Sequence, residues 1–168
     1  MNKTLALASG VVLMLAAGAG FAQQKAPQQS ALPDWQAEPR YATLNLRAGF
    51  EPDPTEVQVE AGGSRQADPV GPGCGGWIDF ERPDVDLNYE AGQFPLIISA
   101  VSEVDTTIVI NDPAGRWICN DDFQGLNPGV VFERPQSGNY NIWVGTFDQG
   151  QTRRATVRVS EVLPSARK

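Results

Sequence analysis

The sequence of 168 residues contains no histidine and only two cysteines, and each scarcity excludes a class of chemistry. Without histidine the chain has no Ser-His-Asp or Cys-His nucleophile and no histidine-ligated zinc. Basic residues are also few: 13 Lys and Arg stand against 20 Asp and Glu, for a formal net charge of −7. This balance argues against electrostatic binding to nucleic acid or to anionic lipid.

One long apolar run is present, and it lies at the start of the chain. The uncharged stretch from Leu5 to Ala19 follows a lysine and leads into small residues, so it has the pattern of a secretory signal peptide cleaved after Ala22. A membrane anchor is the alternative, but the run is shorter than the roughly 20 apolar residues of a spanning helix. We therefore predict a signal peptide over residues 1–22. The exported chain, periplasmic or secreted, would begin at Gln23 and would not insert into the membrane.

Export bears directly on the two cysteines, Cys74 and Cys119. Compartments outside the cytoplasm are oxidising, so a disulfide is the default prediction. Such a bridge would close a long loop and contribute roughly 4 kcal/mol in the chain-entropy model. A buried pair of thiols and a metal site are the alternatives, although two thiolates without histidine make a poor zinc site.

Composition divides the remaining chain into three parts. Residues 23–40 are rich in Gln and Pro and poor in apolar side chains, so we expect a flexible leader. Residues 41–163 show short alternating runs broken by Gly and Pro, and their length predicts a single domain. Residues 164–168 form a tail.

The pattern within 41–163 predicts strands and no helices, because no segment there has a helical stripe. The expected strands are 43–46, 56–59, 77–80, 86–89, 95–101, 106–110, 117–119, 130–133, 140–146 and 155–159. Turn residues separate most of them; in Asn111–Gly115, Asn and Asp bond their own backbone and Gly accepts a positive φ. Strands without intervening helices predict an all-β fold, an antiparallel β-sandwich.

An ordered set of motifs in the second half of the chain resembles a known family. The motifs are Asp105-Thr-Thr-Ile-Val-Ile-Asn-Asp-Pro-Ala-Gly115, Trp117-x-Cys119-Asn-Asp-Asp122, Gly125-x-Asn127-Pro128 and Pro135-Gln-Ser-Gly138-Asn-Tyr140-Asn-Ile-Trp-Val-Gly145. Together they resemble the bacterial pre-peptidase C-terminal domain family, in a stand-alone exported subgroup. The resemblance covers roughly residues 44–161. It implies a jelly-roll-like sandwich with a non-catalytic accessory or binding role.

An acidic cluster brackets the hairpin expected over residues 106–119. If the two strands pair, the two ends of that hairpin come together with several oxygen ligands, as Ca²⁺ requires. Turn formation is the alternative, since Asp and Asn are common turn residues and the spacing is not that of an EF-hand. The candidate calcium ligands are Asp105, Asn111, Asp112, Asn120, Asp121 and Asp122.

Two tryptophans are candidate ligand contacts. Trp117 and Trp143 alternate with polar neighbours, and exposed aromatic side chains on a sandwich face can stack on sugars or apolar peptides. In the strand 140–146, alternation turns Tyr140, Ile142 and Val144 toward the core and Trp143 toward the other face. Packing in the core or beside the disulfide is the alternative for both tryptophans.

These observations favour a non-catalytic exported binding module with no resident cofactor, unless calcium binds. Its partner would be a protein or a polymer, and nucleic acid is disfavoured. A carboxylate-dependent hydrolase is the first alternative, and the pairs Asp84/Asp86 and Asp121/Asp122 are its only candidates. A purely structural envelope protein is the second.

Overall fold

The fold is a two-layer all-β sandwich, here described from a computed structural model that places residues 32–163. The predicted signal peptide, the first part of the leader and the tail lie outside these described residues. The strands are β1 (Ala42–Arg47), β2 (Thr55–Ala61), β3 (Arg65–Gln66), β4 (Trp77–Ile78), β5 (Val85–Glu90), β6 (Leu96–Ser102), β7 (Thr106–Asn111), β8 (Trp117–Asn120), β9 (Gly129–Phe132), β10 (Gly138–Thr146) and β11 (Arg153–Ser160). Every predicted strand is therefore present.

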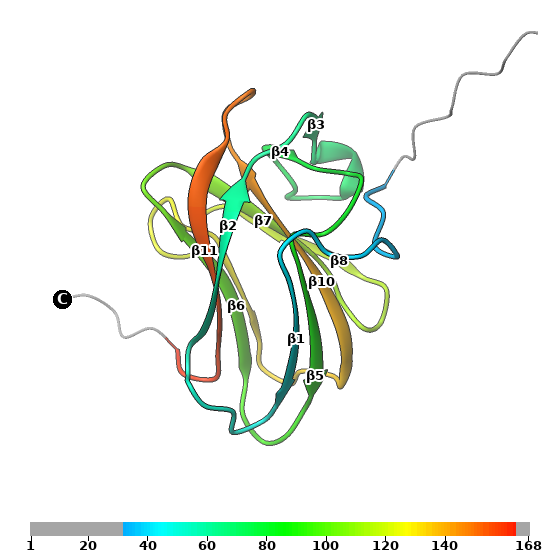
Figure 1. The fold of residues 1–168 in the computed structure, drawn as a ribbon, viewed down its shortest axis with the longest axis vertical. Helices are drawn as coiled ribbons and strands as arrows, with labels where there is room; N and C mark the ends of the chain where they lie inside the picture. The colour runs from blue at the N-terminus through cyan, green and yellow to red at the C-terminus, as the bar shows by residue number, and fades with distance from the viewer. Residues whose placement is uncertain (1–31, 164–168) are drawn as a thin grey trace, which may run out of the picture.

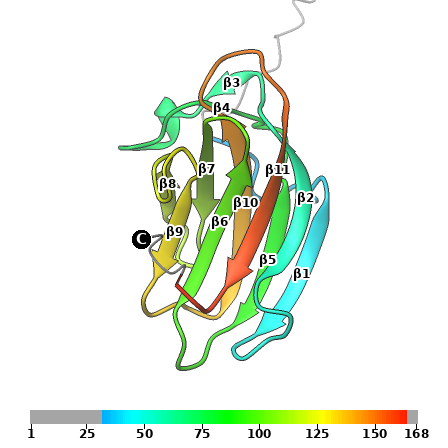
Figure 2. The ribbon, with the colours of Figure 1, turned by 90° about the vertical axis from the view of Figure 1, so that its left-hand side faces the viewer.

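The strands divide into a seven-stranded and a four-stranded sheet that lie face to face (Figures 1 and 2). In the larger sheet, β10 pairs with β7 along one edge and with β5 and β4 along the other; β8, β1 and β3 lie outside these. The smaller sheet has the order β2-β11-β6-β9. The chain crosses between the sheets seven times, from β1 to β2, β2 to β3, β5 to β6, β6 to β7, β8 to β9, β9 to β10 and β10 to β11, so the expected sandwich is confirmed.

One strand pair departs from the antiparallel arrangement that the sequence predicted. β1 runs parallel to β5, with Ala42 opposite Val85 and Arg47 opposite Glu90. A parallel neighbour needs a long connection, and here the chain crosses to β2 in the other sheet and returns through β3 and β4 before it reaches β5. Nothing in the alternation of β1 distinguishes the two directions, because both place the same side chains on the core face.

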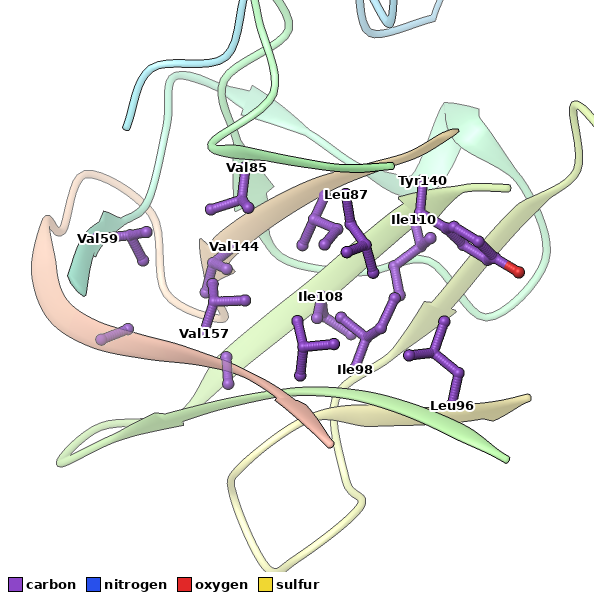
Figure 3. Packing of buried hydrophobic residues seen from close by; sticks show 14 of the residues in the cluster. Val59, Val85, Leu87, Leu96, Ile98, Ile108, Ile110, Tyr140, Val144 and Val157 are labelled. Carbon is purple, nitrogen blue, oxygen red and sulfur yellow. The ribbon is translucent and has the colours of Figure 1, made fainter. Parts of the chain in front are cut away.

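The main core lies between the two sheets and is built from alternate residues of each strand. Figure 3 shows Leu87, Ile98, Ile108, Val144 and Val157 meeting there from strands of both sheets. Tyr140, Ile142 and Val144 of β10 all belong to this cluster, as the alternation predicted. Burying an aliphatic side chain of this kind stabilises the fold by about 1.5–3 kcal/mol.

A second apolar cluster lies on the opposite, outer face of the seven-stranded sheet. Residues 62–80, with β3, β4 and a short 3₁₀ helix (Asp68–Val70), fold over that face at one end of the sandwich (Figures 1 and 2). The approach is close, because a Cβ on Gly145 would lie 2.5 Å from the carbonyl oxygen of Trp77. The predicted disulfide is confirmed: Cys74 of this segment is bonded to Cys119 of β8, with their Cα atoms 5.0 Å apart.

The predicted leader is attached to the sandwich from residue 32 onward. Backbone N–H groups of Asp34, Arg40 and Tyr41 donate to carbonyl oxygens within residues 80–84, at 2.8–3.0 Å. Arg40 also forms an ion pair with Asp79. Residues 32–40 therefore form a strap on the domain, and the prediction of a flexible leader is wrong for them because backbone hydrogen bonds, more than apolar burial, hold this segment. Within residues 32–163, no helix has the length and apolarity needed to span a membrane.

Candidate functional site

The half of the outer face that residues 62–80 leave uncovered is lined with amide side chains. In this half of the sheet, alternation along β1, β5, β10 and β7 puts apolar residues on the core face and polar residues on the outer face. We call this surface the amide face, and it consists of Asn45, Asn88, Asn111, Asn139 and Asn141. Five amides on adjacent strands are unusual, because Asn is depleted in strands.

Three of these amides form a hydrogen-bonded ladder across three strands. Asn139 Nδ2 donates to Asn88 Oδ1, and Asn88 Nδ2 donates to Asn45 Oδ1, both at 3.0 Å. Each amide carries two donor hydrogens and one acceptor oxygen, so every rung keeps hydrogen-bonding capacity beyond the ladder. The ladder therefore fixes the side chains in position and presents donors and acceptors to the solvent side.

Two hollows lie on the amide face and share Asn139. The first, the tryptophan cleft, has a volume of about 440 Å³ and is lined by Trp35, Trp117, Asn111, Asn139 and Asn141 together with the β7–β8 turn. The second, the edge hollow, has a volume of about 490 Å³, and its lining includes Asn45, Arg47, Asn88, Glu90 and Asn139. Because both include Asn139, the two hollows adjoin on the sheet.

Asn111 and Asn141 are the two most buried amide residues that line the tryptophan cleft. Asn111 is 6% exposed. Asn141 is similarly buried at 3%, and its Nδ2 donates to Asp86 Oδ1 at 2.8 Å. An amide offers two donor hydrogens and an acceptor oxygen, so the cleft contains groups that can bind polar ligand atoms.

The turn between β7 and β8 holds one side of the cleft. Asp112 is 3% exposed, and its Oδ1 accepts hydrogen bonds from the backbone N–H of Ala114 and Arg116 at 3.0 and 2.9 Å. Its Oδ2 pairs with the Arg116 guanidinium, and Gly115 has a φ of +74°, as the turn chemistry predicted. The turn fixes the register in which Asn111 lies opposite Trp117.

The strap and the second cluster hold the two tryptophans. Trp35 lies on the strap and is 50% exposed. Trp117 is half-buried, and its ring centroid lies 5.4 Å from that of Trp143, with which it packs in the second cluster. One aromatic ring of the cleft is therefore anchored in the protein interior, and the other is presented from the strap.

Two carboxyl groups near the face have raised pKa values. Burial raises the pKa of Asp84 from 3.8 to about 7, while the Val144 N–H that donates to its Oδ2 and the charge of Arg40 lower it. Burial also raises the pKa of Asp86, against the hydrogen bond from Asn141. Neither residue lines the two hollows. The two hollows of the amide face therefore do not bring these carboxyl groups together, as a hydrolase with paired carboxylates would need there.

The two tryptophan predictions have different outcomes. Trp143 is fully buried in the second cluster, so the prediction that it contacts a ligand is wrong. Alternation did turn it away from the main core, but residues 62–80 cover that part of the outer face. Trp117 lines the tryptophan cleft, and its role as a ligand contact stays a prediction.

The six candidate calcium ligands do not form one site. Asn111 and Asp112 lie at the turn end of the hairpin, while the other four lie at its open end, about 17 Å away along the strands. Asp112 is engaged in the turn, and Asn120 Oδ1 accepts a hydrogen bond from the Gly129 N–H. The expectation that pairing collects all six around one ion is wrong, because a hairpin separates its turn from its open end.

Three of the candidate calcium ligands at the open end of the hairpin are acidic residues. Asp105, Asp121 and Asp122 are close enough that, after the effect of burial, the charges of the other two raise the pKa of Asp105. Among the described residues, however, no group of three or more His, Cys, Asp or Glu side chains is arranged to hold a metal ion. The donor set therefore does not fit Ca²⁺, which takes six to eight oxygen ligands.

The amide face was not predicted from the sequence, although a signal for it is present. In β1, β5 and β10 an Asn stands between apolar residues at a position that alternation turns outward: Asn45, Asn88 and Asn141. An outward amide in three strands is the pattern that would have identified the face. Trp35 was assigned to a flexible leader because the local composition does not reveal the backbone hydrogen bonds of the strap.

No protein-family model matches this chain, and no curated protein matches it. Among solved structures, the crystal structure of Aeromonas hydrophila PliG, a periplasmic lysozyme inhibitor of g-type lysozyme, aligns with 71% of this chain and 96% of its own chain, at 14% identity and a TM-score of 0.37. A likeness this loose transfers neither a partner nor an activity to this chain.

Proposed function

We propose that this protein is an exported, non-catalytic binding module whose amide face binds a saccharide. A saccharide presents hydroxyl groups that both donate and accept hydrogen bonds, and ring faces of C–H groups that stack on aromatic side chains. The amide face offers partners for both kinds of group. Of the two kinds of partner expected from the sequence, a protein or a polymer, this proposal chooses the polymer.

The observation that carries the proposal is that three amide side chains and two tryptophans line one cleft. Asn111 lines the tryptophan cleft with Asn139, Asn141, Trp35 and Trp117, and its residue is more than nine-tenths buried. A ligand hydroxyl can both donate to and accept from such amides. An apolar peptide side chain would cover the amides without bonding to them, and the cost would weaken binding.

The tryptophans would supply the apolar part of the contact. Trp35 has half of its surface exposed, and Trp117 is held by its packing on Trp143. A rigid aromatic ring loses little entropy on binding, which makes such side chains effective anchors. Ordered amides and anchored rings together resemble a preformed ligand site.

Export is supported by the disulfide between Cys74 and Cys119, because such bonds persist in oxidising compartments. We propose a periplasmic or secreted location on this ground and on the signal-peptide pattern of residues 1–22. Kinship with the pre-peptidase C-terminal domains is likewise our proposal, based on the motifs that carry the resemblance. A carboxylate-dependent hydrolase has less support, since Asp84 and Asp86 do not share a cleft.

A glycan array probed with the purified protein tests the proposal, followed by calorimetric titration of the oligosaccharide that binds best. We expect Trp35→Ala and Asn111→Ala each to weaken binding by about ten-fold or more. Phe147→Ala is the matched control, because Phe147 is 48% exposed but lies outside the amide face. Absence of any bound glycan, or equal losses in Phe147→Ala and Trp35→Ala, would overturn the proposal.

A further inference from the structure

We infer that the ligand is an internal stretch of an uncharged polysaccharide, lying across the strands from Trp117 to Asn45. This inference rests on the proposed function and adds the length, charge and direction of the ligand. It depends on the continuity of the two hollows, the charges around them and the position of β1 in the sheet.

The length follows from the geometry of the sheet. The tryptophan cleft and the edge hollow adjoin at Asn139, and the ladder from Asn139 through Asn88 to Asn45 runs along the second of them. The strands cross this path in the order β8, β7, β10, β5, β1. Four steps between neighbouring strands span about 19 Å. A single sugar ring is far shorter than that distance, so several consecutive units are needed to occupy it.

The charge follows from the ion pairs beside the hollows. Among the described residues that line the two hollows, Arg47 is the one basic residue. Its Nε lies 2.8 Å from Glu90 Oε2. Arg116, at the β7–β8 turn, is paired with Asp112 at 2.6 Å. A sulfated or uronic polymer would have to compete with these carboxylates for each guanidinium. An uncharged chain has no such competition and also avoids the repulsion of the carboxylates.

The direction follows from the edge position of β1. In the seven-stranded sheet β1 pairs with β5 alone, so the edge hollow opens at the margin of the sheet. A polymer that enters the tryptophan cleft can therefore continue past Asn45 into solvent. This arrangement fits the middle of a chain, whereas recognition of a chain end requires a closed pocket around the terminal unit.

Calorimetric titration with an uncharged oligosaccharide series, from disaccharide to hexasaccharide in the linkage selected on the array, tests the inference. We expect affinity to rise by about ten-fold or more along the series. Asn45→Ala, at the far end of the ladder, should weaken hexasaccharide binding several-fold and disaccharide binding much less. Trp35→Ala should weaken both. Reduction of the terminal sugar should leave hexasaccharide binding unchanged.

Equal affinity for disaccharide and hexasaccharide, with Trp35 still required, would overturn this inference and leave the proposed function intact. Stronger binding of a sulfated hexasaccharide of the same linkage, or a loss of binding on reduction of the terminal sugar, would also overturn the inference alone. Failure of every oligosaccharide to bind would overturn both. Asn45 is exposed, so its substitution leaves the core untouched.

Discussion

Among individual residues, Asp84 is the buried carboxyl group that connects the start of β5 to the middle of β10. It is 4% exposed, and its Oδ2 accepts the backbone N–H of Val144 at 2.7 Å. Its own backbone N–H donates to the Ile142 carbonyl oxygen at 2.8 Å. Its protonation state therefore affects the free energy of unfolding of the domain.

Burial gives Asp84 a pKa of about 7 in the folded protein, against 3.8 for the unfolded chain. The folded state therefore binds the proton more tightly, and the stability that this supplies is present below about pH 4 and lost as the pH rises through about 7. We expect the free energy of unfolding to fall by a contribution on the order of 4 kcal/mol across this window. In Asp84→Asn that contribution should disappear, so the pH dependence becomes flatter.

Urea unfolding followed by tryptophan fluorescence at several pH values measures this slope. Asp68→Asn is a suitable control, because Asp68 is exposed at the start of the short 3₁₀ helix and should leave the slope unchanged. If Asp84→Asn retains the full pH dependence of the wild type, burial of this carboxyl is not its cause.

At the scale of an element, the β7–β8 hairpin determines the shape of the tryptophan cleft. Its turn places Asn111 opposite Trp117, one on each strand. Asp112 holds the turn through two backbone N–H groups and the Arg116 guanidinium. The same hairpin also carries Cys119, so it links the cleft to the disulfide.

Replacement of Asp112 by Ala should destabilise the protein by about 2 kcal/mol, because two backbone donors lose a charged acceptor. Asp112→Asn keeps an acceptor oxygen for the same N–H groups and should cost less. Thermal unfolding of both variants gives the comparison. Equal losses in the two variants would assign the effect to charge rather than to the hydrogen bonds of the turn.

The hairpin also shows which features of the fold could be predicted from the sequence. Its two strands and its Asn111–Gly115 turn followed from β-branched residues and turn chemistry, which act locally. The burial of Trp143 did not follow, because it depends on residues 62–80 folding back over the sheet. The strap behaves in the same way: its hydrogen bonds join residues that lie more than forty positions apart in sequence, as Asp34 and Phe80 do.

The candidate site likewise depends partly on the local pattern within each strand and partly on which strands become neighbours in the sheet. The amides of the face alternate visibly along each strand, yet their union into one ladder depends on the strand order of the sheet. The parallel pairing of β1 with β5 is what brings Asn45 next to Asn88. Without that order, the three amides are only three outward positions on separate strands.

At the scale of the whole molecule, the disulfide between Cys74 and Cys119 holds residues 62–80 in place over the second cluster. It joins residues 62–80 to β8 across a sequence separation of 45. Closing a loop of that length contributes about 4 kcal/mol in the chain-entropy model. The same bond holds the segment that buries Trp143, on which Trp117 packs.

We expect the double variant Cys74→Ala/Cys119→Ala to lose about 4 kcal/mol of stability. Guanidinium unfolding of the double variant and of the oxidised and reduced wild type gives the measurement. The reduced wild type is the matched control and should resemble the double variant. Equal stability of the oxidised and reduced protein would contradict the prediction.

The strand order of the smaller sheet has a consequence for secretion. β11, the last strand of the chain, lies between β2 and β6, so β2 has no neighbour in its sheet until β11 has been synthesised. Pairing between segments so distant in sequence slows folding. The smaller sheet of a nascent chain therefore stays incomplete until β11 has been made. In the export that we propose, a translocation channel would receive a chain whose smaller sheet is still open.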